Sequence, residues 1–360
     1  MRKLIVQFKS TRRMTMSDAY WATNKVAAMK LARDIIYNTP FEGAVPEVYS
    51  WYEGTDRPGD KAWVIQSAPP SDSVPLKSRF NREHEQKDIL DHIAKLQRYF
   101  QAYKMPRSYG SCSFTSTGQV CAGPLQQPNL GGPFTTSRDM MKAELRRDFS
   151  RAKRHHELQG WTCEPELRQQ LAEFIAHSMN TMLSTIQDCD PIFTLNKLEL
   201  SNFLCDKYGG RINYIIDFSW ASITHPIMEF FNSYVTMFGV LPFFPNENWA
   251  ILHRAVLNGF EKKHVDVDLR GLDFLAYIQE IRDPAESYRI GRELYEAFEK
   301  AKVKTPREIK GAEAMSAFMG LCAAVGARSW SPPGASPEDV YQAKVKNLTD
   351  SLREVRKWAN

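Results

Sequence analysis

The sequence contains few cysteines, and their arrangement defines no site. Six cysteines are scattered through 360 residues without a C-x-x-C pair or a regular spacing. This scatter argues against a structural zinc site and against a disulfide framework, and it is typical of a protein in a reducing compartment. The six are Cys112, Cys121, Cys163, Cys189, Cys205 and Cys322.

Long apolar runs and a strong net charge are also lacking. No apolar segment approaches the roughly 20 residues that span a bilayer. The apolar part of Met1–Lys9 is too short for a secretory signal. The formal net charge of +5 is modest for this length and does not by itself indicate nucleic acid. We therefore expect a cytoplasmic protein that has no membrane or nucleic-acid partner.

One basic stretch needs a separate explanation. The predicted helix 137–158 carries eight basic residues between Lys142 and His156, but Asp139, Glu144 and Asp148 are interleaved with them. This mixture indicates a solvated helix face. A nucleic-acid-binding module is the distant alternative, and it would require binding to a polynucleotide that depends steeply on salt.

The most informative segment is Phe193–Ala221, FTLNKLELSNFLCDKYGGRINYIIDFSWA. It predicts a strand at 203–205, a second strand at 212–216, and a tight turn in which Gly209 and Gly210 supply positive φ. Asn202 precedes the first strand and Asp217 follows the second, so the hairpin brings two oxygen-bearing side chains together. A kinase-type site holds Mg²⁺ against a triphosphate with such a pair.

This segment resembles the aminoglycoside phosphotransferase and choline kinase branch of the kinase-like fold, and most closely its fungal members. Those proteins carry His-Gly-Asp, four residues, Asn-Ile-Leu, a hairpin, and Ile-Ile-Asp-Trp-x-Trp-Ala. Here SNFL at 201–204 and IIDFSWA at 215–221 fit that pattern. The resemblance implies an α+β, bilobal protein kinase-like fold, with a small truncated β-rich N-lobe and a large, mostly helical C-lobe.

The catalytic base that the resemblance implies is replaced. Leu195-Asn196-Lys197 stands where the family has His-Gly-Asp, so Lys197 occupies the position of the proton-accepting aspartate. A lysine, with an ordinary pKa of about 10.4, accepts no proton while charged. Asn202 and Asp217 remain as the implied metal ligands. Glu199 is an alternative base, but its shift of two residues moves the carboxylate several ångströms from the acceptor.

The small lobe departs from the family as well. The predicted strand 4–9 corresponds to the family's third strand, whose lysine or arginine pairs with the α- and β-phosphates. Gln7 occupies that slot, and Lys9 lies on the same face by the two-residue period. The two strands and the glycine-rich turn that cover the phosphates in the family do not precede it. Either the lobe is truncated or the coding sequence starts further upstream.

Lys25 is a further departure, on the predicted helix 18–37. Thr23-Asn24-Lys25-Val26-Ala27 resembles the family's Asn-Glu-Val-Ala, whose glutamate pairs with the strand lysine. A lysine at this position repels a cation instead of pairing with it. We expect Lys25 to be a solvated helix lysine, since charged side chains on helices are usually exposed. The alternative is that Lys25 takes over a phosphate contact.

The remaining chain is organised around the implied hinge. The predicted strand 63–67 leads into it, and the resemblance implies that the backbone near Gln66 and Ser67 contacts adenine. The Pro- and Ser-rich segment that follows has no periodic pattern and is predicted to be a linker. We expect an N-lobe at 1–68, a hinge or linker at 69–77, and a C-lobe at 78–360. Further predicted elements are a hairpin at 109–134 that turns at Gly118, helices at 83–103, 164–186, 226–238, 246–263, 269–280, 284–300 and 308–325, and a last helix capped by Ser336.

Two functions remain open. The first is a phosphotransferase-like protein without ordinary activity, which binds a small molecule or a protein partner and in which ATP and Mg²⁺ are the implied cofactors. The second is an active, divergent ATP-dependent small-molecule kinase of unknown acceptor, in which Lys197 stabilises charge. The altered positions Gln7, Lys25 and Lys197, together with the missing glycine-rich turn, favour the first.

Overall fold

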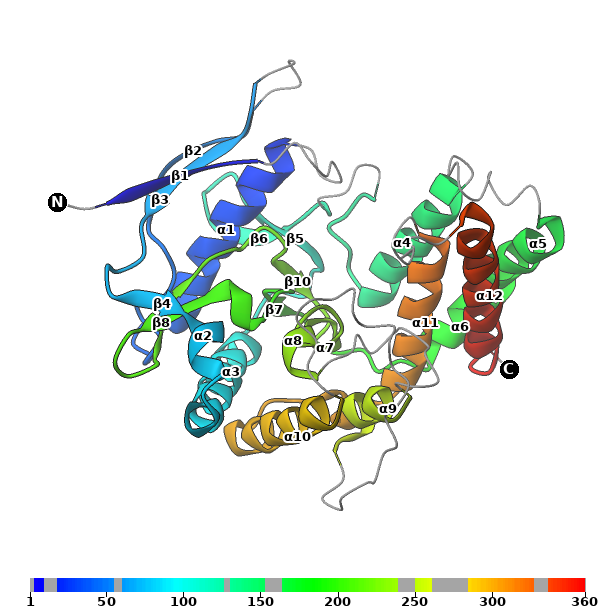
Figure 1. Cartoon of the computed structure of the whole chain (residues 1–360). Helices are drawn as coiled ribbons and strands as arrows, with labels where there is room; N and C mark the ends of the chain where they lie inside the picture. Colours follow the sequence, from blue (N-terminus) through cyan, green and yellow to red (C-terminus); the bar gives the residue numbers. More distant parts are fainter. Residues whose placement is uncertain are drawn as a thin grey trace. The chain divides into compact units, whose positions relative to one another are not determined.

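Helices and short antiparallel sheets share the chain. The computed structural model describes residues 3–9, 18–54, 60–125, 130–152, 164–238, 250–260, 284–326 and 336–359. Its mixture of elements confirms the predicted α+β class (Figure 1). No helix within these ranges combines the length and apolarity that crossing a membrane requires.

The chain folds into two compact units. The first contains 1–137, 189–237 and 292–304, and the second contains 138–188, 238–291 and 305–360. The lobe boundaries expected at 1–68, 69–77 and 78–360 differ from this division and stay a prediction. The residues discussed below as a site all belong to the first unit.

The first unit begins with a three-stranded sheet in the order β1 (Leu4–Phe8), β3 (Trp63–Ser67), β2 (Val48–Tyr52). Helix α1 (Asp18–Ile36) packs against β2 and β3. Val64 on β3 is fully buried in a cluster with Trp21, Ala22, Val26 and Ala62. The strand predicted at 63–67 and the helix predicted at 18–37 are therefore confirmed.

The hairpin that the sequence predicts forms the second sheet, in the order β4 (Ser73–Pro75), β8 (Phe203–Asp206), β9 (Ile212–Ile215). Its turn is fixed by the Asp206 carboxylate, which accepts backbone N–H bonds from Tyr208, Gly209 and Arg211. Gly210 has a φ of +67°, but Gly209 is not in the left-handed region, so one of the two glycines was assigned wrongly. β4 lies within the segment 69–77 that is expected to be a hinge or linker, and it pairs with β8.

The third sheet has the order β6 (Val120–Gly123), β5 (Gly110–Phe114), β10 (Ser222–Thr224), β7 (Ile192–Thr194). The hairpin turn predicted at Gly118 is confirmed by its φ of +76°. Helix α3 (Glu83–Ala102) packs against β7 of this sheet, whereas α2 (Leu76–Phe80) packs against β4 and β8 of the second sheet. A 3₁₀ turn at Leu200–Asn202 contacts α2, and α7 (Ile227–Asn232) follows β10 in the chain. The single helix predicted at 226–238 is wrong, because Tyr234, at φ +66°, separates α7 from α8 (Val235–Phe238).

The remaining elements are helical. They are α4 (Ser137–Ala152), α5 (Pro165–Glu173), a π-helical turn (Phe174–Ser178), α6 (Met179–Ser184), α9 (Ala250–Asn258), α10 (Pro284–Ala301), a 3₁₀ turn (Pro306–Glu308), α11 (Ala312–Val325) and α12 (Pro337–Arg356). The predicted cap of the last helix is confirmed: Ser336 and Asp339 form a reciprocal capping box. The helix predicted at 269–280 lies outside the described residues.

Candidate functional site

The ends of the β8–β9 hairpin meet, as the sequence predicts. Asn202 and Asp217 are directly hydrogen-bonded, although 15 positions separate them. The Asn202 Oδ1 atom accepts the backbone N–H of Asp217 at 2.8 Å, and its Nδ2 donates to the Asp217 carbonyl at 3.0 Å. The same Nδ2 donates to the Lys197 carbonyl at 3.1 Å. Asn202 is buried and joins the loop of Lys197 to the segment of Asp217.

The Asp217 carboxylate is surrounded by donors from its own chain. Oδ1 accepts hydrogen bonds from the Ser219 backbone N–H at 2.9 Å and from the Ser219 hydroxyl at 2.6 Å. Lys25 Nζ lies 3.4 Å from the same oxygen, and Lys197 Nζ lies 3.9 Å from Oδ2. We call Lys25, Asp217 and Lys197 the Lys–Asp–Lys cluster.

Helix α1 supplies the buried half of this cluster. Trp21, Asn24 and Lys25 follow one another at helical spacing and face the segment 217–219. Trp21 Nε1 donates to Ser219 Oγ at 3.0 Å, and Asn24 Nδ2 donates to the Ser219 carbonyl at 3.1 Å. Asn24 Oδ1 also accepts the backbone N–H of Cys112 at 2.7 Å, which ties α1 to β5.

The prediction that Lys25 is a solvated helix lysine is wrong. Its side chain is 2% exposed, and its Nζ atom pairs with Asp217 and lies 5.9 Å from the centre of the Trp21 ring. A buried lysine is stable only when its charge is compensated. The sequence pattern of α1 gave no sign of this, because the compensating carboxylate lies 192 positions away.

The charges of the cluster affect one another. Burial lowers the pKa of Lys25, and the Asp217 carboxylate opposes that shift without reversing it. Burial would raise the pKa of Asp217, but the Lys25 ammonium, the hydrogen bonds from Ser219 and the Lys197 ammonium together lower it. The carboxylate is therefore kept ionised by cations that belong to the chain itself.

The loop that carries Lys197 is held by hydrogen bonds to residues that the sequence analysis did not identify as part of the site. The Glu229 carboxylate, fully buried on α7, accepts the Leu195 backbone N–H at 2.7 Å and the Ser233 hydroxyl. Asn196 adopts φ +55° and donates from Nδ2 to the Trp220 carbonyl at 3.0 Å. The only sequence signal for Glu229 is that it is a lone acid within the apolar helix IMEFFN.

Burial has a direct consequence for Glu229. It raises the pKa of this carboxyl from its ordinary value of 4.5 to about 7, although the hydrogen bonds from Ser233, Leu195 and Asn196 act in the opposite direction. The Oε2 atom of Glu199, the alternative base, accepts a hydrogen bond from Ser201 Oγ at 3.4 Å.

The residues present do not fit a magnesium ion. Mg²⁺ requires near-octahedral oxygen coordination at about 2.0–2.1 Å. The Oδ1 atoms of Asp217 and Asn202 are already occupied by donors, and Oδ2 of Asp217 faces Lys197. In the described part of the chain, no three His, Cys, Asp or Glu side chains gather into a group that could hold a metal.

Charge opposes a metal ion as well. An ion bound to Asp217 Oδ2 would lie within about 6 Å of the present Lys197 Nζ position, where the repulsion is roughly 5 kcal/mol at an effective dielectric constant of about 20. The Lys197 side chain is 38% exposed and is able to move away, whereas the buried Lys25 is not. Lys25 therefore is the residue that most firmly disfavours a cation.

The predicted nucleotide-contacting residues are placed on β1 and β3. Gln7 and Lys9 are half-buried, and Gln7 is paired with the buried Val64, so it lies on the sheet face toward α1. The Gln66 side chain is fully buried and donates to Tyr214 Oη at 2.8 Å. Tyr214 Oη in turn donates to the Ser67 carbonyl at 2.8 Å.

The backbone predicted to contact adenine is largely engaged within the chain. The Ser67 N–H donates to the Glu47 carbonyl at 2.8 Å, and the Ala68 N–H donates to the Lys3 carbonyl at 3.0 Å. The Ser67 hydroxyl accepts the Glu47 N–H at 2.9 Å. Since these groups already have partners, an adenine contact by Gln66 or Ser67 would require other groups or a rearrangement.

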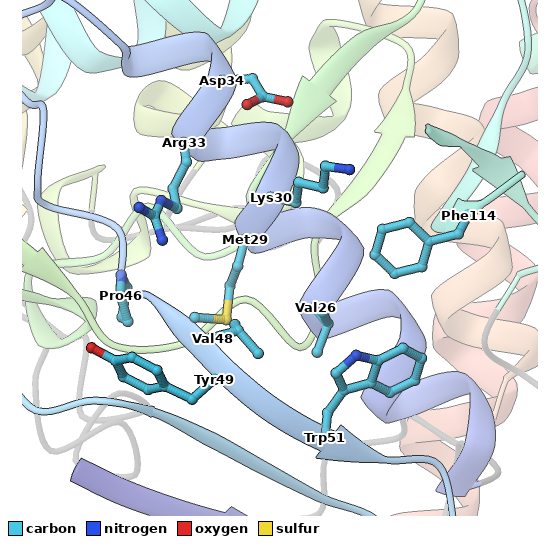
Figure 2. Close-up of a pocket in the computed structure, with 10 residues that line it drawn as sticks. All are labelled: Val26, Met29, Lys30, Arg33, Asp34, Pro46, Val48, Tyr49, Trp51 and Phe114. Atoms are coloured by element: carbon cyan, nitrogen blue, oxygen red, sulfur yellow. The ribbon is translucent and has the colours of Figure 1, made fainter. Parts of the chain in front are cut away.

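A surface groove of about 460 Å³ lies between α1 and β2 (Figure 2). Val26, Met29, Val48 and Trp51 line it with apolar surface, while Lys30, Arg33 and Asp34 lie on the α1 side. None of the predicted cofactor or catalytic residues lines this groove. It is therefore not the predicted nucleotide site.

Known proteins similar to this chain are found among solved structures. No protein-family model matches the chain, and no curated protein matches it either. Among solved structures, it is similar to the aminoglycoside phosphotransferase APH(4)-Ia in a ternary complex with ADP and hygromycin B. The identity is 12%, the TM-score is 0.45, and the match covers 99% of this chain and 86% of that one.

A Ralstonia eutropha protein classed with the aminoglycoside phosphotransferases is similar at 13% identity and a TM-score of 0.40. That match covers the whole of this chain and 93% of the other. Both matches extend over nearly the whole of this chain, and both of those proteins are described as aminoglycoside phosphotransferases.

Proposed function

We propose that this chain is a kinase-like protein of the aminoglycoside phosphotransferase type that binds a ligand and does not transfer phosphoryl groups. The observation that carries the proposal is the Lys–Asp–Lys cluster. The residue that would hold metal, Asp217, is engaged by Lys25, and the position of the proton acceptor is occupied by Lys197. The affiliation with fungal members rests on the sequence motifs around Asn202 and Asp217.

Two requirements of phosphoryl transfer are unmet in this arrangement. The reaction needs metal ions that neutralise the β- and γ-phosphates and a residue that orients or deprotonates the acceptor. General base catalysis contributes about 10²–10⁴-fold to the rate. Losing the base alone would slow the reaction, and losing the metal site together with it removes most of the remaining electrostatic stabilisation.

One structural feature, the position of Lys197, favours the alternative that the chain is an active kinase. Lys197 presents a partly exposed ammonium on a loop that Asn202 and Glu229 hold in place, as a group that stabilises charge on a transferred phosphate would. This alternative predicts turnover that depends on Mg²⁺, and the proposal predicts none.

The experiment is a measurement of ATP consumption with Mg²⁺ and a panel of hydroxyl-bearing acceptors, made on the wild type and on Lys197→Asp. We expect no turnover above background in the wild type. Lys197→Asp restores the family's residue but leaves Lys25 in place, so we expect it to stay inactive. Turnover by the wild type that requires Mg²⁺ and is lost in Asp217→Ala would contradict the proposal.

A further inference from the structure

The buried Lys25 ammonium has more hydrogen-bond donors than acceptors around it. Nζ carries three N–H groups, and among the described residues the acceptor within its reach is Asp217 Oδ1, at 3.4 Å. The Trp21 ring at 5.9 Å attracts the charge but offers no lone pair along a hydrogen bond. Each remaining N–H group of this buried ammonium that has no acceptor raises the free energy of the folded chain. An oxygen atom of a ligand that accepted such a bond would remove that cost.

Lys197 places a second ammonium beside the same carboxylate. Its Nζ lies 3.9 Å from Asp217 Oδ2, which is longer than a hydrogen bond, so its donors also remain available in the described structure. Lys197 is 38% exposed and Asp217 is 26% exposed. The cluster is therefore open to solvent on the side of Lys197, and a ligand can approach from there.

The balance of charge selects the sign of that ligand. Two lysines face one carboxylate, whose Oδ1 is already bonded by Ser219, so the cluster carries a net positive charge. We propose that the Lys–Asp–Lys cluster binds the phosphate group of an anionic ligand directly through Lys25 and Lys197, without a divalent cation. This inference rests on the proposed function, because it names the ligand class of the same site.

The Lys25 side chain and the loop that carries Lys197 are held in place before any ligand arrives. Lys25 is fixed by the bonds of its neighbours Trp21 and Asn24 to Ser219, and the Lys197 loop is fixed by Asn202 and Glu229. A site positioned in this way loses little conformational entropy on binding. Lysine binds phosphate as a point charge and imposes no planar geometry, so it suits a tetrahedral oxyanion.

Recognition is concentrated on the phosphate and not on a base. Backbone groups at Ser67 and Ala68, where adenine is expected, already have partners in the chain. An inorganic polyphosphate should therefore bind about as well as ATP does. ATP that bound much more tightly than tripolyphosphate would show that the base is also recognised.

The test is calorimetric titration of the full chain with inorganic phosphate, tripolyphosphate and ATP, each in EDTA and in Mg²⁺. We expect tripolyphosphate and ATP to bind in EDTA, and Mg²⁺ to weaken that binding because it neutralises the ligand. The proposal would be overturned by an absence of binding of all three ligands in EDTA, or by binding that requires Mg²⁺.

Three variants assign the binding to the cluster. Lys197→Met, at an exposed position, should weaken tripolyphosphate binding by about 10- to 100-fold, the value of a charge-assisted hydrogen bond. Asp217→Asn should preserve or tighten binding, because it removes a repelling charge, whereas a metal-mediated site would lose its ligand. Lys30→Met removes an exposed lysine from α1, the helix that carries Lys25, and should leave the affinity for tripolyphosphate unchanged. Equal losses in Lys197→Met and Lys30→Met would place the anion elsewhere.

The two proposals fail in different ways. Phosphoryl transfer from Mg²⁺–ATP contradicts the proposed function and this inference together. A chain that transfers no phosphate and binds no polyphosphate in EDTA contradicts this inference alone. Circular dichroism spectra of each variant establish that a lost affinity is not a lost fold.

Discussion

The Nζ atom of Lys25 lies 3.4 Å from Oδ1 of Asp217, across 192 positions of the sequence. This ion pair joins the middle of α1 to the segment that follows the β8–β9 hairpin. It occupies the carboxylate oxygen that a metal ion would need, and a lysine that the sequence suggested to be solvated is thereby buried. The proposed role of the chain as a binding protein depends on this ion pair.

Replacing Lys25 should reveal its effect on cations. Lys25→Glu restores the residue type of the resembling family and places two carboxylates side by side. Their repulsion should lower the stability of the metal-free chain by up to about 4 kcal/mol. Millimolar Mg²⁺ or Mn²⁺ should then raise the Tm of the variant and leave the Tm of the wild type unchanged, because a ligand stabilises only the state that binds it. An equal metal response in both proteins would show that Lys25 does not govern cation binding.

Asn202 should be essential to the fold of the site, whatever it binds. Asn202→Ala deletes bonds to the Asp217 N–H, the Asp217 carbonyl and the Lys197 carbonyl, and leaves these groups without partners. Unmade bonds of buried groups cost about 1–3 kcal/mol each, and since they are partly shared here we expect a loss of roughly 2–4 kcal/mol in urea denaturation. Asn258→Ala removes one exposed bond to Glu313 and should change stability by less than about 0.5 kcal/mol. Similar small effects in both variants would contradict this role.

Glu229 should make stability depend on pH. Because its pKa rises from 4.5 unfolded to about 7 folded, the folded state binds the proton more tightly. Its contribution is therefore present in full below pH 4.5 and is lost as the pH rises to about 7. The loss is at most roughly 3 kcal/mol.

Glu229→Gln keeps an acceptor for the Leu195 N–H and removes the titration. The free energy of unfolding, measured by urea denaturation across this pH window, should fall less steeply in the variant than in the wild type. Glu173→Gln, at an exposed position, is the matched control and should follow the wild type. Identical profiles for Glu229→Gln and the wild type would show that Glu229 does not titrate there.

Trp21 should support the cluster through its indole nitrogen. Trp21→Phe loses the 3.0 Å bond to Ser219 Oγ, leaves part of a buried space unfilled, and weakens the ring attraction for Lys25. We expect a loss of about 1–3 kcal/mol in thermal or urea denaturation. Trp220→Phe, whose side chain is 44% exposed, should cost less than about 0.5 kcal/mol. Equal costs for the two exchanges would rule out a specific role for the Trp21 bond.

The hairpin and most of the regular elements could be predicted from the sequence because their signals are local. The turn at Gly210, the strand around Val64, and the cap at Ser336 each depend on a few neighbouring residues. The meeting of Asn202 with Asp217 followed from the hairpin itself. The sequence predicted, however, that Asn202 would offer an oxygen to a metal ion. In the structure, the Asn202 amide is hydrogen-bonded to the backbone of Asp217 and does not present a free ligand oxygen.

The pairing of residues that are distant along the chain could not be predicted from the sequence. Nothing near Lys25 indicates Asp217, and nothing near Leu195 indicates Glu229. The helix break at Tyr234 was missed for the same reason, because the hydroxyl of the preceding Ser233 accepts the N–H of Leu198, 35 positions away. These are tertiary contacts, which override the local preference of an apolar segment for a continuous helix.

The most direct test of the account is a titration of Mn²⁺ into the wild type and Asp217→Asn, followed by the electron paramagnetic resonance signal of free Mn²⁺. We predict that the wild type leaves the signal undiminished, because Lys25 and Lys197 neutralise Asp217, and that the variant behaves identically. A signal that decreases with the wild type and is restored in Asp217→Asn would show a working metal site at Asp217 and would contradict the account.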